Sequence, residues 1–220
     1  ADIVVNSTSK YINANSSAIS GVITDGGKFK WDTEKYPGMK DFKKFGPFAY
    51  TAKLRNGLFR NTGACLSPQN AFYNSIGMET LGLRMERVCD NAKTLAQFFA
   101  TEYSDIEVNY PGLAGSKWHN IATEQFGDKF GGIITIRTGN KKRAFGIIDA
   151  LKLPLIVSNI GDTKTLVIHP ESTLNVHSTQ EEKETAGVFD DLIRISVGIE
   201  DIDDLIDDFK QAIESVKDVY

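Results

Sequence analysis

"SPQNAFYNSIGMETLGLRMERVCDNAKTLAQFFATEY", residues 67–103, divides this chain into two parts of different character. Ser67 suits the N-cap of a helix, and Pro68 suits the first helical position, where its missing N–H group costs nothing. Apolar residues then recur at helical spacing, namely Phe72, Ile76, Leu81, Leu83, Met85, Val88, Leu95, Phe98 and Phe99. This pattern predicts one long helix over residues 67–101, bent near Gly77 or Gly82, that connects two domains.

The residues before this helix predict the end of an α/β domain. Residues 3–5 and 18–24 each have the β-branched, apolar composition of a strand, and Ile3-Val4-Val5 is predicted to be buried. The polar run at 13–17 predicts a loop between them. Residues 25–50, rich in Gly, Pro, Lys and aromatic side chains, predict a long irregular connection with one short helix.

The residues after the helix predict a small α+β domain. Strands are expected within residues 106–112, 131–139, 165–170 and 192–198, and helices within 141–153 and 201–219. The last of these is amphipathic, with its acidic residues in the first turns, where they suit the helix dipole. We therefore expect the end of a large domain over 1–66, a connecting helix over 67–101 and an α+β domain over 102–220.

The totals describe an ordinary globular protein of 220 residues, with 41% hydrophobic and 25% charged residues. The net charge of −4 gives no basic face, which argues against nucleic acid as a partner. No apolar run approaches the roughly 20 residues that span a bilayer, so no membrane association is expected. The first residues, ADIVVNS, have neither an initiating Met nor the basic start of a signal peptide, which suggests a fragment or half of a longer polypeptide.

The cysteines and the acidic residues carry little functional information. Cys65 and Cys89 form neither a CxxC pair nor a metal-ligand spacing, so we expect a reduced, cytoplasmic compartment and no metal site. The acids that concentrate from Glu200 onward are typical of a solvated helix face.

Lys10 follows the first predicted strand closely. A lysine held out of water has a lowered pKa and can form a Schiff base with a carbonyl group. Ser7, Thr8 and Ser9 place hydroxyl and N–H groups beside it, which suits one side of a phosphate. The alternative, a solvated surface lysine, stays open from this stretch alone.

Three other polar residues lie in or near predicted strands. Arg194 interrupts an apolar strand, so its charge is expected either to form a structural salt bridge or to face a cavity, where its planar fork suits a carboxylate. Asn159 precedes a Gly-Asp turn and could donate to an anionic ligand. His169 is expected to be a structural histidine, because no Ser or Cys with a carboxylate surrounds it in the order of a catalytic triad.

Several segments resemble, in their order, the pyridoxal-phosphate (PLP) enzymes of cysteine and methionine metabolism. Within them the chain most resembles the O-acetylhomoserine sulfhydrylases. The resemblance covers nearly the whole chain and implies that it is the second half of such an enzyme. The implied fold is α/β, the aspartate-aminotransferase-like fold type I, with the C-terminal part of the large domain and a small α+β C-terminal domain. The segments that carry the resemblance are SxxK after an apolar strand, LSPQNAFYNSIGMETLGLRMERVCDNA, VNYPGL, SNIGDTKTLVIHPEST and DLIRISVGIEDIDDLI.

The resemblance also implies the cofactor, the site and the reaction. Lys10 falls on the lysine that binds pyridoxal 5'-phosphate and acts as general base, and Ser7 and Ser9 fall on the positions that hold the cofactor phosphate. Arg194 and Asn159 fall on positions that hold the α-carboxylate of the amino-acid substrate. The implied reaction is γ-replacement on O-acetyl-L-homoserine with sulfide or methanethiol, which gives homocysteine or methionine and acetate. The implied partners are the N-terminal half of the same enzyme and further copies in a homotetramer.

Two kinds of alternative stay open at this point. The same scaffold supports a cystathionine γ-synthase, or a γ-lyase that breaks down methionine or cystathionine. The second alternative is that the chain is a non-catalytic fragment that needs its N-terminal half.

Overall fold

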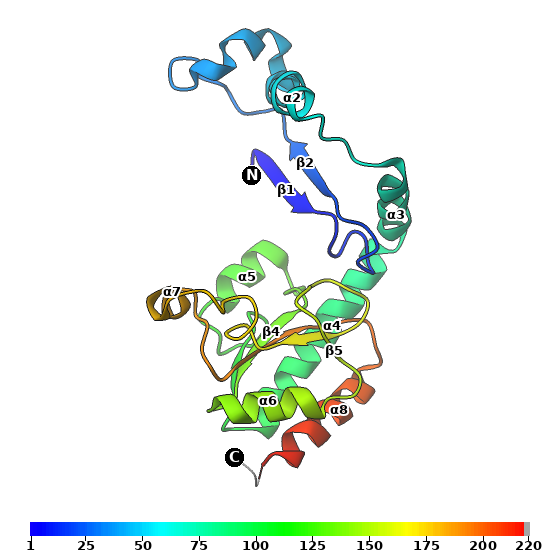
Figure 1. Ribbon diagram of the computed structural model, residues 1–220, viewed down its shortest axis with the longest axis vertical. Coiled ribbons are helices and arrows are strands. Elements are labelled where there is room, and N and C mark those ends of the chain that lie inside the picture. The colour runs from blue at the N-terminus through cyan, green and yellow to red at the C-terminus, as the bar shows by residue number, and fades with distance from the viewer. Residues whose placement is uncertain (218–220) are drawn as a thin grey trace. The chain divides into compact units, whose positions relative to one another are not determined.

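The computed structural model describes residues 1–217 and divides the chain into two compact units, Ala1–Gly77 and the residues from Met78 onward (Figure 1). The predicted division into 1–66, 67–101 and 102–220 differs from these two units and stays a prediction. Among the helices of residues 1–217, none combines the length and apolar character needed to cross a membrane.

The amino-terminal unit contains a two-stranded antiparallel sheet and a series of helical turns. β1 (Ile3–Ser7) pairs with β2 (Gly21–Asp25), so the two predicted strands are confirmed with shifted ends. The predicted irregular connection contains more helical structure than expected, because 3-10 turns and an α-helix begin within it. The elements that follow β2 are η1 (Pro37–Phe48), α1 (Ala49–Leu54), the π-helical η2 (Arg55–Phe59), α2 (Arg60–Thr62) and α3 (Pro68–Glu79).

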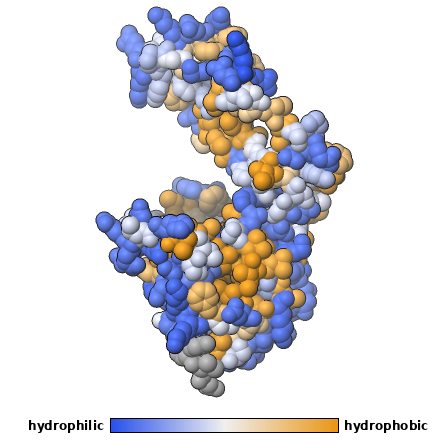
Figure 2. All heavy atoms as spheres, viewed as in Figure 1, coloured by the Kyte–Doolittle hydropathy of each residue, from blue (hydrophilic) through white to orange (hydrophobic). Residues whose placement is uncertain are grey.

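The predicted burial of the first strand is wrong for this chain. Val4 is 41% exposed and Val5 is 70% exposed, and on β2 both Val22 and Ile23 are 39% exposed. A two-stranded sheet cannot bury the side chains of both its faces without further layers, and among residues 1–217 these strands pair only with each other. Apolar residues therefore lie on the surface of this unit, where Figure 2 shows them in orange.

The carboxyl-terminal unit is built on a five-stranded sheet in the order β3-β4-β7-β6-β5. All neighbouring strands are antiparallel except β5 and β6, which are parallel. The predicted strands and helices of this part are confirmed, with the addition of a short fifth strand and two helices. Residues 218 and 219 of the last predicted helix lie outside the described residues. The elements are α4 (Leu81–Glu102), β3 (Glu107–Asn109), α5 (His119–Phe126), β4 (Ile133–Arg137), α6 (Lys141–Ala150), β5 (Leu155–Ile156), β6 (Leu166–Ile168), α7 (Gln180–Thr185), β7 (Leu192–Ser196) and α8 (Ile202–Ser215).

The core of this unit lies between one face of the sheet and the helices α4, α6 and α8, which are labelled in Figure 1. Alternate strand residues point to this face, and those on β4, β6 and β7 are fully buried. They are Ile134, Ile136, Val167, Ile193 and Ile195. The residues between them, including Thr135, Arg194 and Ser196, belong to the opposite face of the sheet, which we call the second face.

The predicted long helix is two helices that meet at Thr80. The predicted N-cap is confirmed, because the Ser67 hydroxyl accepts from the Asn70 N–H at 3.2 Å. Thr80 leaves helical geometry with φ −108° and ψ 4°, and its hydroxyl accepts from the Arg84 side chain at 3.0 Å. The interruption therefore lies between the two glycines, Gly77 and Gly82, at which a bend was expected.

Two features of the carboxyl-terminal unit escaped the sequence analysis. α7 begins with a complete capping box between Thr179 and Glu182. The sequence TQEE has the residue pattern of this motif. Asp208 does not belong to a solvated face, since it is 6% exposed and accepts from the N–H groups of Lys152 and Leu153, both at 2.9 Å. Asp208 thereby ties α8 to the end of α6.

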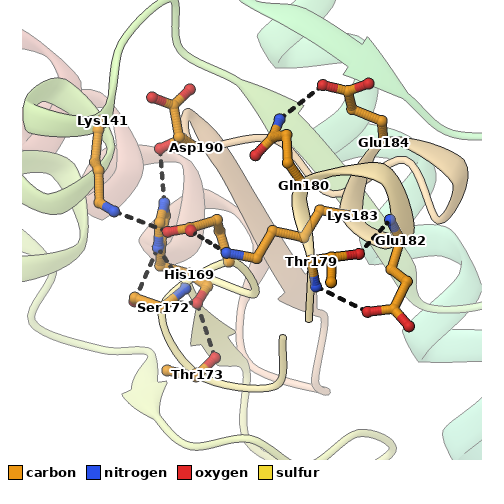
Figure 3. Close-up of polar contacts among 11 residues, drawn as sticks. Lys141, His169, Ser172, Thr173, Thr179, Gln180, Glu182, Lys183, Glu184 and Asp190 are labelled. Atoms are coloured by element: carbon orange, nitrogen blue, oxygen red, sulfur yellow. Dashed lines mark hydrogen bonds and ion pairs between the residues drawn. The ribbon is translucent and has the colours of Figure 1, made fainter. Parts of the chain in front are cut away.

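The connection between β6 and β7 is held by an ion-pair cluster around Glu171. Its carboxylate accepts from the Lys141 ammonium of α6 at 2.8 Å and from the Lys183 ammonium of α7 at 2.5 Å. Figure 3 labels Lys141 and Lys183, the two lysines whose ammonium groups pair with this carboxylate. The hydrogen bonds from Lys141 and Lys183 lower the pKa of Glu171 from 4.5 to about 2.

The Glu171 carboxylate stabilises the fold only while it is ionised. Its stabilising contribution is complete above its unfolded pKa of 4.5 and is lost as the pH falls toward the folded pKa of about 2. We expect Glu171→Gln to lower the free energy of unfolding by about 1 kcal/mol at neutral pH. Urea unfolding at neutral pH and at about pH 3 should show this deficit shrinking in acid.

Glu124→Gln is the matched control, because Glu124 is an exposed residue of α5 without an ion pair among the described residues. It should change the free energy of unfolding little at either pH. A Glu171→Gln deficit that did not depend on pH would contradict the ion-pair explanation.

Candidate cofactor and substrate site

Lys10 lies in a tight turn directly after β1. The Asn13 N–H donates to the Thr8 carbonyl at 3.0 Å and to the Lys10 carbonyl at 3.1 Å, which fixes the backbone of the lysine. The Lys10 side chain is half-buried, and Thr8 beside it is 5% exposed. The turn thus presents an amine from a well-defined backbone position.

The side chain of Asn74, on α3, forms hydrogen bonds with this turn. Its side-chain amide donates to the Thr8 hydroxyl at 3.3 Å and to the Ser20 hydroxyl at 2.9 Å. The Asn13 amide donates back to the Asn74 side-chain oxygen at 3.4 Å. Asn74 is 8% exposed, so these groups satisfy each other away from water.

Gly77 lets α3 approach the same turn. A Cβ atom at this position would overlap the backbone carbonyls of Ile12 and Asn13. Only glycine therefore allows the helix and the turn to pack backbone against backbone. From the sequence, Gly77 is expected only as a possible bend, and Asn74 has no predicted role.

Ser7 and Ser9, predicted to hold a phosphate, flank the buried Thr8. Ser7 is exposed at the end of β1, where it pairs with Gly21. The Ser9 hydroxyl accepts from the Ser20 N–H at 2.9 Å and donates to the Ser20 carbonyl at 3.2 Å. Ser9 must release the Ser20 carbonyl to donate to a phosphate, since a hydroxyl has one proton.

Arg194 lies on the second face of the sheet, in the middle of β7. Its cross-strand neighbours are Thr135 on β4 and Ile168 on β6. Among residues 1–217 no carboxylate lies within salt-bridge distance of the guanidinium, so the structural salt bridge considered as an alternative is not found. Burial lowers the pKa of the Arg194 guanidinium below its usual range.

Asn159 contacts Arg194 through its backbone. The Arg194 Nη2 group donates to the Asn159 carbonyl at 3.1 Å. This contact brings together the two residues that were predicted to hold a carboxylate, and it leaves the remaining N–H groups of the planar fork for other acceptors. The role of the Asn159 side chain stays a prediction.

His169 is a structural histidine, as predicted. It is 3% exposed, its Nδ1 atom lies 2.9 Å from the Ser172 hydroxyl, and its Nε2 atom lies 2.7 Å from the Asp190 carbonyl (Figure 3). Its ring packs on Phe145 with 4.7 Å between centroids. Both ring nitrogens are therefore engaged inside the fold.

Comparison with known proteins places the chain among enzymes. A family model that describes Cys/Met metabolism PLP-dependent enzymes matches residues 1–214. A sulfhydrylase of Fusarium oxysporum f. sp. lycopersici is 37% identical over 97% of this chain and 52% of the relative. An O-acetyl-L-homoserine sulfhydrylase of Corynebacterium glutamicum is 38% identical over 98% of this chain and 53% of the relative. The chain therefore spans about half the length of the curated relatives that it matches.

A solved structure has the same fold. It is a Campylobacter jejuni protein assigned as an O-acetylhomoserine (thiol)-lyase, with a TM-score of 0.88 and 33% identity over 97% of this chain and 54% of that chain. That structure carries N'-pyridoxyl-lysine-5'-monophosphate, the cofactor joined to a lysine. The match confirms the predicted α/β fold type I.

Asn74 is expected to support the Lys10 turn through its hydrogen bonds. Asn74→Ala leaves the Thr8 and Ser20 hydroxyls short of a buried partner, and should lower the free energy of unfolding by about 1–3 kcal/mol. Urea unfolding of the whole enzyme measures the change.

Asn70→Ala is the control on the same helix, because Asn70 is only partly buried and its side-chain amide donates to the Ile19 carbonyl, at 3.2 Å. It should cost less than about 1 kcal/mol. Equal losses of free energy of unfolding in the two variants would show that the hydrogen bonds of Asn74 contribute no more to stability than the hydrogen bond of Asn70.

Proposed function

The chain belongs to the Cys/Met metabolism PLP-dependent enzymes, and from this premise we propose that it is the C-terminal half of a transferase that acts on O-acetyl-L-homoserine. The enzyme replaces the acetate group at Cγ with sulfide, or with methanethiol. The products are homocysteine, or methionine, and acetate. The observation that carries the proposal is Arg194, a half-buried guanidinium bound to the Asn159 carbonyl, in a chain matched almost end to end by sulfhydrylases.

The turn after β1 suits pyridoxal 5'-phosphate. Lys10 offers an amine from a fixed backbone, and Ser7 and Ser9 offer hydroxyl donors on either side of Thr8. An amine for the aldehyde and hydroxyls for the phosphate are the groups that this cofactor requires. When bound, the cofactor supplies an electron sink for charge that develops on the substrate.

The residues of this chain have two further roles, which are substrate binding and proton transfer. Arg194 holds the α-carboxylate through parallel N–H groups, and the Asn159 carbonyl keeps the guanidinium plane in place. Lys10 is the proposed general base that moves protons at Cα and Cβ of the substrate. A general base must lie within hydrogen-bond reach of the proton it takes. Proton removal at Cβ allows acetate to leave from Cγ and the thiol to bind there.

The N-terminal half of the same enzyme is the proposed partner of the amino-terminal unit. Val4, Val5, Val22 and Ile23 expose apolar surface that a larger sheet and its helices would cover. The relatives, which are about twice as long as this chain, have the residues to supply that cover. A homotetramer in the cytoplasm, which the family resemblance implies, completes the proposal.

A sister activity on the same scaffold is the second candidate. Cystathionine γ-synthase and the γ-lyases use the same cofactor, and a relative of this chain from Schizosaccharomyces pombe, 38% identical over 97% of the chain, is named homocysteine synthase. That name favours replacement by sulfide over elimination.

Lys10→Ala tests the cofactor assignment in the whole enzyme. Lysine-bound pyridoxal absorbs near the edge of the visible range, and this band should disappear in the variant because no amine remains to bind the aldehyde. Lys28→Ala, at an exposed lysine of the same unit, should keep the band. A band that survives in Lys10→Ala would refute the role of this lysine.

The substrates distinguish the sulfhydrylase from its sister enzymes. The whole enzyme should convert O-acetyl-L-homoserine and sulfide to homocysteine, with one acetate released for each, and should release little ammonia from methionine alone. Chromatography of the thiol product and an ammonia assay measure the two rates. Faster breakdown of methionine would favour the γ-lyase, and faster reaction with cysteine would favour the cystathionine synthase.

A further inference from the structure

Ser196 is a buried hydroxyl at the end of β7, two residues after Arg194. The two side chains belong to the same face of the sheet because strand residues alternate. Ser196 is 1% exposed, and its hydroxyl accepts from the Gly161 N–H at 3.0 Å. The proposed reaction gives this hydroxyl no role.

Arg194 and Ser196 hold neighbouring peptide groups of one turn. Arg194 donates to the Asn159 carbonyl, and Ser196 accepts from the N–H of Gly161, two residues later. Gly161 has φ +73°, a left-handed conformation that glycine adopts without strain. The turn that contacts the guanidinium is thus anchored to the strand that carries the guanidinium.

The rest of the loop is fixed to the residues that follow β7. The Ile199 N–H donates to the Thr163 carbonyl at 2.9 Å, and the Gly198 N–H donates to the Thr165 hydroxyl at 2.9 Å. The Glu200 carboxylate accepts from the N–H and the hydroxyl of Thr165 at 2.5 and 2.9 Å. These bonds hold residues 163–165, whereas the turn at 159–161 is tied to β7 by Arg194 and Ser196.

We propose that Ser196 is a positioning residue that sets the selectivity of the enzyme for substrates with an α-carboxylate. The inference rests on the proposed function of Arg194. The Ser196 hydroxyl fixes the Gly161 N–H, which fixes the Asn159 carbonyl, and this carbonyl orients the guanidinium toward the carboxylate. Without the hydroxyl, the buried Gly161 N–H loses its acceptor, so the turn shifts to find another and the carbonyl moves with it.

The test compares two ligands that differ only in the carboxylate. L-Norleucine has an α-carboxylate and lacks a leaving group at Cγ, and 1-pentylamine is the same molecule without the carboxylate. Calorimetric titration of the whole enzyme with each ligand gives a ratio of dissociation constants, with no turnover needed. Ser196→Ala should reduce the preference for norleucine about tenfold, the loss expected when a charge-assisted hydrogen bond is misaligned.

Three further variants complete the experiment. Arg194→Ala should abolish the preference for norleucine. Ser196→Cys, which keeps the size and a weak acceptor, should reduce it by less than Ser196→Ala does. Thr138→Val is the matched control, since Thr138 is 1% exposed and its hydroxyl bonds to the Asp191 carbonyl at 3.2 Å, at the other end of β4 and β7. It should lower thermal stability and leave the preference unchanged.

The outcomes separate the inference from the function on which it rests. A preference lost in Arg194→Ala and kept within twofold in both Ser196 variants would overturn the positioning role while the proposed function stands. A preference kept in Arg194→Ala would overturn both. A reduced preference in Thr138→Val equal to that in Ser196→Ala would show a general effect of destabilisation and would also overturn the positioning role.

Discussion

The position of Arg194 depends on the burial of its two neighbours on β7. Ile193 and Ile195 are both fully buried against the helices, and alternation of strand side chains then places Arg194 on the second face. A slip of one residue in register would bury the guanidinium among apolar side chains, at a large cost in free energy. The hydrophobic core therefore keeps the guanidinium on the second face, where we propose that it binds a carboxylate.

The core determines on which face of the sheet Arg194 lies, and hydrogen bonds to the backbone then orient its guanidinium. The Asn159 carbonyl takes one N–H group of Arg194, and the Ser196 hydroxyl holds the same turn. Gly198 permits this close packing, since a Cβ atom there would overlap the Thr163 carbonyl and the Glu200 carboxylate. The segments SNIGDTKT and RISVGIE are far apart in the sequence and are thus joined by hydrogen bonds and close packing.

The turn that carries Lys10 follows a different principle. It has a small local core of polar groups, in which Asn74 joins the hydroxyls of Thr8 and Ser20. The sheet beneath it exposes Val5 and its apolar neighbours. The carboxyl-terminal unit buries its own core, whereas the amino-terminal unit leaves apolar side chains on its surface.

The strands and helices with strong periodicity and the N-cap at Ser67 could be predicted from the sequence alone, and the family motifs predicted the fold and the cofactor. These rest on local patterns, which a single chain displays in full. The break at Thr80, the exposure of Val5 and the buried roles of Asn74, Ser196 and Asp208 became visible only in the three-dimensional structure. These depend on which distant groups lie opposite each other, because burial and hydrogen-bond partners are properties of pairs and no single position in the sequence records them.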